Sequence, residues 1–478
     1  MPISRLGVTV LPEYFQSEGI EAVLDNLTGR LGANAVTTSP YVAAEAGPED
    51  GSREPPVDAG SGKTRKLDRP LWGKDEVWMK TSPSFAPTPS HYIDTPYRPD
   101  PATDLTRAEG PMVGHFLDAA KARGMKTYLQ VMAAIPPSYR VQFGGPVAAD
   151  QPMMPDGRPV PDRVDRNATL ASPGLRNYMD GLIRDLCAAY PQCDALKFDW
   201  PEYPPYHFLM GLADYNPQVA PFAAKIGIDF NGLQRAMQQD CPRDTIRQAI
   251  LDDLPVDALI DQLEQTSDTL ADHFRLRRHL VADFARFLTD SVKRHSGGRM
   301  GVLLQGFPPP WNRMSGFDPA TLAGIADELA IKFYTMHWPM IGQNYVTEGA
   351  RLFDLPETTL AGYFHRHFMG NPVNGDTAPP LAYPAPDVAH GISADTINAR
   401  MTALGQDGVI GISHSYGPDA DVCARFDALA HAAKGLLDIN RYAYLSDSKL
   451  DALSSIVARH KPAHTPNQEA DRNAAPFA

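Results

Sequence analysis

The stretch Ala195-Leu-Lys-Phe-Asp-Trp-Pro-Glu-Tyr-Pro-Pro-Tyr206 is a short apolar segment that leads directly into a carboxylate and several aromatic rings. Side chains alternate between the two faces of a β-strand, so Lys197 and Asp199 are expected to point the same way. Asp199 could simply pair with Lys197, or begin a turn before Pro201. The alternative is that Asp199 carries chemistry at the end of this strand, and the rest of the chain favours that interpretation.

Seven other segments resemble this strand, and most of the eight are followed by a stretch with helical periodicity. Regular alternation of strands and helices predicts an α/β fold, here a TIM (β/α)8 barrel. The predicted strands are Arg5–Leu11, Ala33–Ser39, Lys126–Met132, Ala195–Asp199, Met300–Gly306, Leu329–Tyr334, Thr359–His365 and Gly408–His414.

Helical connections are expected between these strands. The clearest start is Ser172-Pro173, a capping residue followed by proline at the first helical position. The predicted helices are Gly19–Leu31, Pro111–Arg123, Pro173–Tyr190, Leu276–His295, Pro319–Ile325, Ser393–Leu404 and Asp419–Asp438.

Two long excursions interrupt the alternation, each at the carboxyl end of a strand. Residues 42–110 form a Pro-rich loop insertion after the second strand, and residues 202–275 form a mostly helical insertion after the fourth. Loops after the strands build the active sites of such barrels, so both insertions are expected to shape a pocket. We therefore expect a single catalytic barrel over residues 1–460, followed by a disordered tail over 461–478.

Composition excludes several partners. Acidic residues outnumber basic ones by 57 to 44 and the formal net charge is −13, so nucleic acid and anionic membranes are poor candidates. The four cysteines show neither disulfide density nor zinc-type pairing, and the first residues lack the pattern of an export signal. These observations predict a cytoplasmic protein with free thiols. The oligomeric state stays open, and a dimer is possible.

A barrel would gather the residues at its strand ends into one mouth. Carboxylates, amides, imidazoles and aromatic rings together suit sugar chemistry, because rings stack on a pyranose while polar groups bind its hydroxyls. The residues expected to bind substrate there are Glu13, Tyr41, Gln130, Lys197, Gln305, Lys332, Tyr334, His337, His365, His367 and His414.

Residues 196–199, Leu-Lys-Phe-Asp, resemble the fourth-strand motif of α-galactosidase-type glycoside hydrolases, and the run from Asn167 to Asp199 resembles the preceding helix and strand of barrel glycosidases. The resemblance implies Asp199 as nucleophile and Lys197 as a sugar ligand. One departure is important. Enzymes of that family take their acid/base from an aspartate after the sixth strand, where this chain has Tyr334, His337 and the more distant Glu348.

Glycoside hydrolysis requires a second carboxyl group. Glu202 is the predicted general acid/base because it lies three residues beyond Asp199 in the same mouth, although a loop carboxylate held by solvent or arginine would have the same sequence. The predicted activity is hydrolysis of a small glycoside or oligosaccharide by this carboxylate pair, without a cofactor or metal.

Two alternatives remain. His365 and His367, at i and i+2 on a predicted strand, could bind one metal ion together with His414 or His337 and Asp199, as in an isomerase, epimerase or metal-dependent hydrolase. The second alternative is a barrel that binds a saccharide without cleaving it.

Overall fold

A computed structural model describes residues 2–56, 65–136, 139, 144–160, 166–239, 243–373 and 377–460. The expected tail over 461–478 lies outside these residues. Within the described part, no helix combines the length and the apolar character that crossing a bilayer would require.

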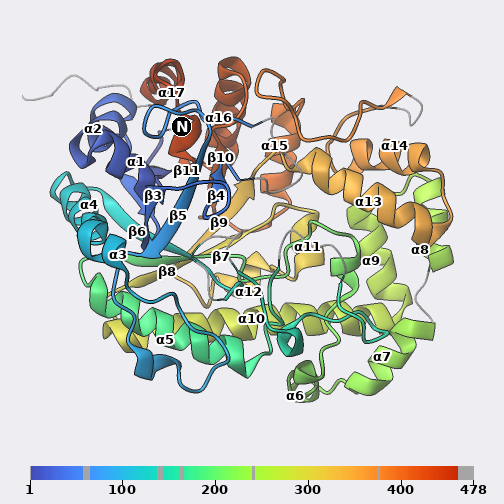
Figure 1. The fold of residues 1–478 in the computed structure, drawn as a ribbon. Coiled ribbons are helices and arrows are strands. Elements are labelled where there is room, and N and C mark those ends of the chain that lie inside the picture. Colours follow the sequence, from blue (N-terminus) through green and yellow to red (C-terminus); the bar gives the residue numbers. More distant parts are fainter. Residues whose placement is uncertain are drawn as a thin grey trace, which may run out of the picture.

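Eight parallel strands close into a barrel, with helices around it (Figure 1). The last strand pairs with the first, Arg5 opposite Leu436 and Val8 opposite Ile439, which closes the ring. The predicted TIM barrel is therefore confirmed. Its strands, in chain order, are β1 Arg5–Thr9, β2 Ala35–Thr38, β6 Lys126–Met132, β7 Ala195–Asp199, β8 Gly301–Gly306, β9 Glu328–Phe333, β10 Ile410–His414 and β11 Leu436–Asn440.

The predicted seventh strand, Thr359–His365, is wrong. These residues belong to helix α14, Glu357–His367, in which Leu360, Tyr363 and Phe364 are buried. Their spacing of three and four residues is the period of a helix that buries one face, and it overrides the β-forming residues Thr and Tyr.

The eighth strand was also misplaced. The segment Gly408–His414 contains β10, which is the seventh strand, and the helix predicted over Asp419–Asp438 ends at Ala432 as α16. Lys434 and Gly435 then take positive φ angles of 51° and 81°, which no α-helix accommodates, and β11 follows.

The other helices cover the outside of the barrel. Helix α5 begins as expected: Leu175 N donates to Ser172 Oγ at 3.0 Å, and Pro173 is at the first turn. Apart from short 3-10 helices and the four helices α6 to α9 given below, the helices are α1 Pro12–Glu18, α2 Ile20–Leu24, the π-helical η1 Asp25–Leu31, α3 Asp104–Glu109, α4 Pro111–Ala122, α5 Pro173–Ala189, α10 Asp268–Ser296, α11 Trp311–Ser315, α12 Pro319–Leu322, α13 Trp338–Phe353, α14 Glu357–His367, α15 Ala394–Thr402, α16 Asp419–Ala432 and α17 Asp447–Arg459.

The two insertions have regular structure of their own. The first contains a three-stranded antiparallel sheet, β3 Tyr41–Glu45, β5 Val77–Pro83 and β4 Ser52–Glu54 in that order. The second packs against α13 and α14 and encloses with them a cavity of about 100 Å³ lined by apolar side chains. Its helices are α6 Ala220–Lys225, α7 Phe230–Gln239, α8 Arg243–Leu251 and α9 Val256–Thr266.

Candidate active site

Asp199, the last residue of β7, lies beside a lysine from another strand. Lys332 Nζ, on β9, donates to Asp199 Oδ1 at 2.8 Å, and the same ammonium lies 3.8 Å from Glu202 Oε1. The lysine side chain is 1% exposed and the Asp199 side chain 13%. Two carboxyl groups that are three residues apart in the chain therefore face one buried cation.

Glu202 is completely buried. Its Oε2 accepts a hydrogen bond from Ser315 Oγ at 2.6 Å, and Oε1 lies 3.8 Å from Lys332 Nζ. Burial raises the pKa of the Glu202 carboxyl from 4.5 to about 7, although Lys332 and Ser315 act in the opposite direction. This carboxyl group can thus hold a proton near neutral pH.

Trp200 follows Asp199 in a strained backbone conformation. Its φ of 53° is a left-handed value that a bulky side chain rarely adopts, and such residues concentrate at functional sites. The bend allows Trp200 N to donate to Asp199 Oδ1 at 3.0 Å. The strained backbone at Trp200 thus helps to orient the Asp199 carboxylate.

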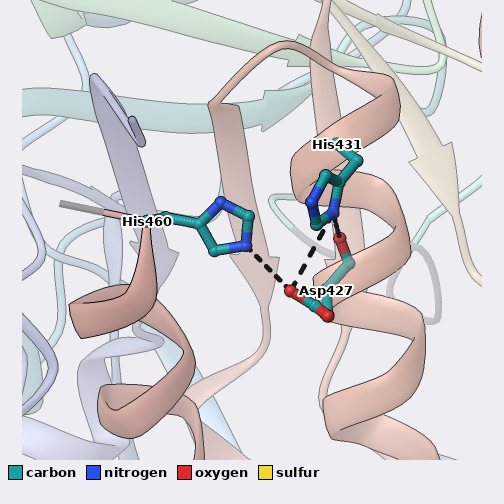
Figure 2. Close-up of side chains that lie close together, drawn as sticks. All are labelled: Asp427, His431 and His460. Atoms are coloured by element: carbon teal, nitrogen blue, oxygen red, sulfur yellow. Dashed lines mark hydrogen bonds and ion pairs between the residues drawn. The ribbon is translucent and has the colours of Figure 1, made fainter. Parts of the chain in front are cut away.

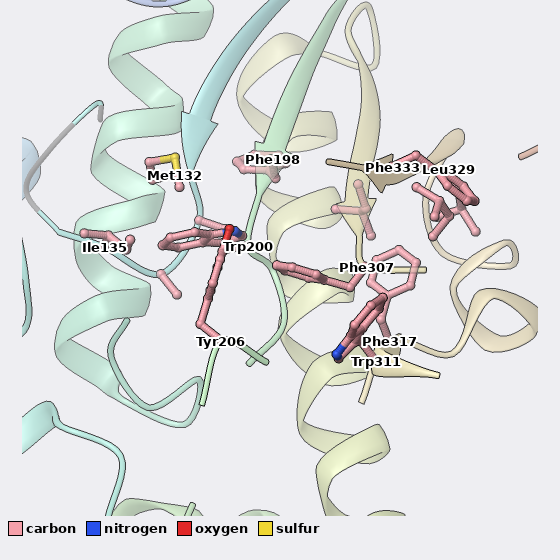
Figure 3. Packing of buried hydrophobic residues seen from close by; sticks show 14 of the residues in the cluster. Met132, Ile135, Phe198, Trp200, Tyr206, Phe307, Trp311, Phe317, Leu329 and Phe333 are labelled. Atoms are coloured by element: carbon pink, nitrogen blue, oxygen red, sulfur yellow. The ribbon is translucent and has the colours of Figure 1, made fainter. Parts of the chain in front are cut away.

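The rings of Trp200, Tyr206 and Phe307 pack together beyond the carboxyl ends of β7 and β8 (Figure 3). Tyr206 makes edge contacts with Trp200 at 5.7 Å and with Phe307 at 5.4 Å between ring centroids. Lys332 Nζ lies 4.3 Å from the centre of the Phe307 ring, so the ammonium is held by both carboxylate and π-electrons.

A second group of predicted residues adjoins these rings. Tyr206 Oη is 3.0 Å from His337 Nδ1, and the Tyr334 ring contacts both His337 and His414. Burial, followed by the nearby His337, lowers the pKa of His414 well below its usual value, so His414 is neutral. His414 Nδ1 accepts a hydrogen bond from Tyr416 N at 3.0 Å.

The remaining polar residues of the predicted mouth form pairs. Tyr41 Oη donates to Glu13 Oε2 at 2.9 Å, and Gln305 Nε2 donates to Gln130 Oε1 at 3.2 Å. Glu13 has no exposed surface, and Gln305 is 1% exposed. The structure therefore brings Tyr41 beside Glu13 and Gln305 beside Gln130.

Lys197 forms its ion pair with a residue of another barrel strand. Its ammonium has no exposed surface and donates to Asp438 Oδ2 at 2.9 Å and to Thr37 Oγ1 at 3.4 Å. Asp199 forms its ion pair with Lys332, from β9.

His365 and His367 are absent from the barrel mouth, which corrects the prediction of a histidine pair on a strand. Both belong to helix α14, where residues two apart point to different sides. His365 Nε2 donates to the backbone oxygen of Pro379 at 2.8 Å, and His367 Nε2 is 2.9 Å from Asp253 Oδ1. The two imidazoles therefore have separate structural partners.

Four participants were not among the predicted site residues: Trp200, Tyr206, Phe307 and Ser315. Phe307 follows the end of β8 as Trp200 follows β7, so the position after each strand could have identified both rings. Ser315 lies on the short helix α11, and no local pattern links it to Glu202, 113 residues away.

No protein-family model matches the sequence, and neither does any curated protein. Among solved structures, the chain is similar to a β-galactosidase from the psychrophilic Marinomonas ef1, with 13% identity and a TM-score of 0.49 over 95% of this chain and 59% of that chain. The catalytic domain of β-amylase from Paenibacillus polymyxa has 11% identity and a TM-score of 0.47 over 96% and 99%. An α-galactosidase from Lactobacillus brevis has 13% identity and a TM-score of 0.38 over 95% and 40%. At such identities the similarity concerns the fold alone.

Proposed function

We propose that this chain is a carbohydrate-active enzyme that hydrolyses a small glycoside or oligosaccharide. The observation that carries the proposal is the position of Lys332, whose ammonium faces both Asp199 and Glu202 at the carboxyl ends of the strands. Active sites of (β/α)8 barrels are formed at this end, and a pair of carboxyl groups is the machinery that glycoside hydrolysis needs.

The two carboxyl groups have environments that suit different roles. Glu202, with its pKa raised to about 7 by burial, would hold the proton that a leaving oxygen needs. Asp199, ion-paired with Lys332, would attack or stabilise the anomeric carbon. Two carboxyl groups whose environments differ in this way are the pattern by which one site supplies both acid and nucleophile.

The spacing of the pair favours retention of anomeric configuration. Asp199 Oδ1 and Glu202 Oε1 can be no further apart than the sum of their 2.8 Å and 3.8 Å distances to Lys332 Nζ. Retaining enzymes place their carboxyl groups about 5–5.5 Å apart, and inverting enzymes about 6.5–9.5 Å. The largest possible separation of the two oxygens therefore only reaches the lower end of the range for inverting enzymes.

The surrounding rings suit a sugar. Trp200, Tyr206 and Phe307 supply apolar faces for a pyranose, while the neutral His414 and the amide of Gln305 supply hydrogen-bonding groups for hydroxyls. Because Glu202 is completely buried, we expect the segment after β7 to open when substrate enters.

That burial also favours a second candidate, a barrel that binds a saccharide without cleaving it. A carboxyl group with no exposed surface cannot donate a proton to a substrate unless the site rearranges. In this case the rings and the polar pairs would bind the sugar, and Asp199 would act only as a ligand.

The test is a screen of wild-type and Asp199→Asn protein against aryl glycosides of neutral and acidic sugars, with and without EDTA. We expect wild-type turnover that survives EDTA, falls by at least ~10³-fold in Asp199→Asn, and gives product of retained configuration by NMR. His367→Ala, on helix α14, is the matched control and should keep wild-type activity.

A second variant distinguishes chemistry from damage to the fold. Asp199→Ala should regain turnover when azide is added, because a small anion can occupy the place of the missing nucleophile and form a glycosyl azide. Saccharide binding without turnover in the wild type would instead establish the binding-only candidate. Full activity in Asp199→Asn would exclude the proposed carboxylate pair.

A further inference from the structure

Three potential metal ligands lie together on the outer helices (Figure 2). Asp427 and His431 are one helical turn apart on α16, and His460 directly follows the last residue of α17. Helix α16 leads into the amino end of β11, and α17 starts after its carboxyl end. The cluster therefore lies at the barrel face opposite to the candidate active site.

The donor atoms are already close to one another. His460 Nε2 is 2.8 Å from Asp427 Oδ1, and His431 Nδ1 is 3.9 Å from the same oxygen. One ligand atom from each residue lies within 4.8 Å of the other two, and the imidazole centroids are 4.7 Å apart. Tetrahedral zinc with bonds near 2.0–2.1 Å needs about 3.3 Å between donors, so shifts on the order of 1 Å would form the site.

The ring nitrogen of His431 nearest to Asp427 Oδ1 is Nδ1, which also lies 2.8 Å from the backbone oxygen of Asp427. A metal ion bound at Nδ1 would replace this hydrogen bond. Because the imidazole is largely exposed, it has room to turn and make the exchange.

The three ligand side chains differ in their exposure to solvent. The side chain of His431 is 62% exposed and that of Asp427 37%, so a hydrated ion can reach them, whereas His460 is 5% exposed and held in place. A competing cation is present, because Arg459 Nη2 lies 4.0 Å from Asp427 Oδ2. The Arg459 side chain is 62% exposed and can turn toward solvent.

We propose that Asp427, His431 and His460 form a binding site for a divalent transition metal of the zinc class, with water completing the coordination. Two imidazoles and one carboxylate are the ligand types that Zn²⁺ binds, and Mg²⁺ and Ca²⁺ prefer oxygen alone. The bound ion would tie the last turn of α17 to α16. The proposal is independent of glycoside turnover.

The test is a Zn²⁺ titration of the full, untagged chain in competition with a chromophoric chelator. We expect the wild type to bind one equivalent more tightly than His431→Ala, by on the order of 10–100-fold. Zn²⁺ should also raise the unfolding temperature of the wild type and not that of His431→Ala. Since His431 is largely exposed, this variant is expected to fold.

Two further variants sharpen the result. His367→Ala removes a histidine that is paired with Asp253 beside Arg366 and should leave zinc binding unchanged. Arg459→Gln removes the competing cation and should tighten binding. Equal zinc affinity in the wild type and His431→Ala, or no zinc binding by the wild type, would overturn the proposal.

Discussion

Glu202 combines complete burial with a carboxyl group whose nearest cation, Lys332, is 3.8 Å away. Burial penalises the charged form and raises the pKa to about 7. Ser315 donates to one oxygen and leaves the other directed toward Lys332. A proton is thereby retained beside Asp199 at a pH at which ordinary carboxyl groups are ionised.

We expect the kcat/KM of the wild type on aryl glycosides to decline as pH rises through about 7, because the general acid loses its proton there. Glu202→Gln should abolish this alkaline limb and lower the rate most for substrates with poor leaving groups. The pH profiles of both proteins are the measurement, and an unchanged alkaline limb in Glu202→Gln would assign it to another residue.

The same pKa shift predicts a stability effect that needs no substrate. A folded-state pKa of about 7 lies above the unfolded value near 4.5, so the stabilisation is complete below pH 4.5 and is lost as pH rises to 7. Relative to Glu202→Gln, the wild type should lose on the order of 3 kcal/mol of unfolding free energy between pH 4 and pH 8. Denaturant unfolding at both pH values checks this, and a constant difference would contradict it.

Strand β1 depends on a glycine for its position inside the barrel. Gly7 lies opposite Asp438 of β11, and a Cβ at Gly7 would overlap Oδ1 of Asp438. The missing side chain at Gly7 thus leaves room for the buried carboxylate of Asp438.

Gly7→Ala should therefore reduce the free energy of unfolding by about 1–3 kcal/mol, because Asp438 must move away from its ion-pair partners. Gly29→Ala, in η1, is the matched control: no atom lies within 4 Å of its added Cβ, and the change should be small. Urea unfolding of the two variants compares them. Equal stability would mean that Asp438 can shift without cost.

The barrel as a whole is linked through Asp438. This residue of the last strand pairs with Arg5 of the first at 3.1 Å and with Lys197 of the fourth at 2.9 Å. Burial alone would raise the pKa of Asp438, but Lys197 and Arg5 outweigh that effect and lower it below 3.8. One carboxylate of the last barrel strand therefore connects to the first strand and to β7, which carries Asp199.

Asp438→Asn should cost about 3–5 kcal/mol of unfolding free energy, because it leaves two buried cations without their anion. The wild-type contribution is present above pH 3.8 and should disappear as pH falls through the lower folded-state pKa. Asp407→Asn, which breaks only an exposed pair with Lys434, should have little effect. Thermal and acid unfolding measure both, and similar losses in the two variants would contradict this view of the network.

Local sequence determined much of the barrel. The first six predicted strands and the segment containing β10 are barrel strands, because each short apolar run is bounded by turns and helices. The sequence also placed Asp199 at the end of a barrel strand, and Asp199 is the last residue of β7.

The helical spacing of Leu360, Tyr363 and Phe364 was also present in the sequence, although the segment was predicted as a strand. Only the tertiary structure decided the last strand, because Leu436–Asn440 finds its hydrogen-bonding partners in β1 and β10. The partners of the charged residues were equally hidden: Asp199 pairs with a lysine 133 residues away, and Lys197 with an aspartate 241 residues away. Ion pairing inside a barrel depends on strand order and register, which short-range patterns in the sequence do not contain.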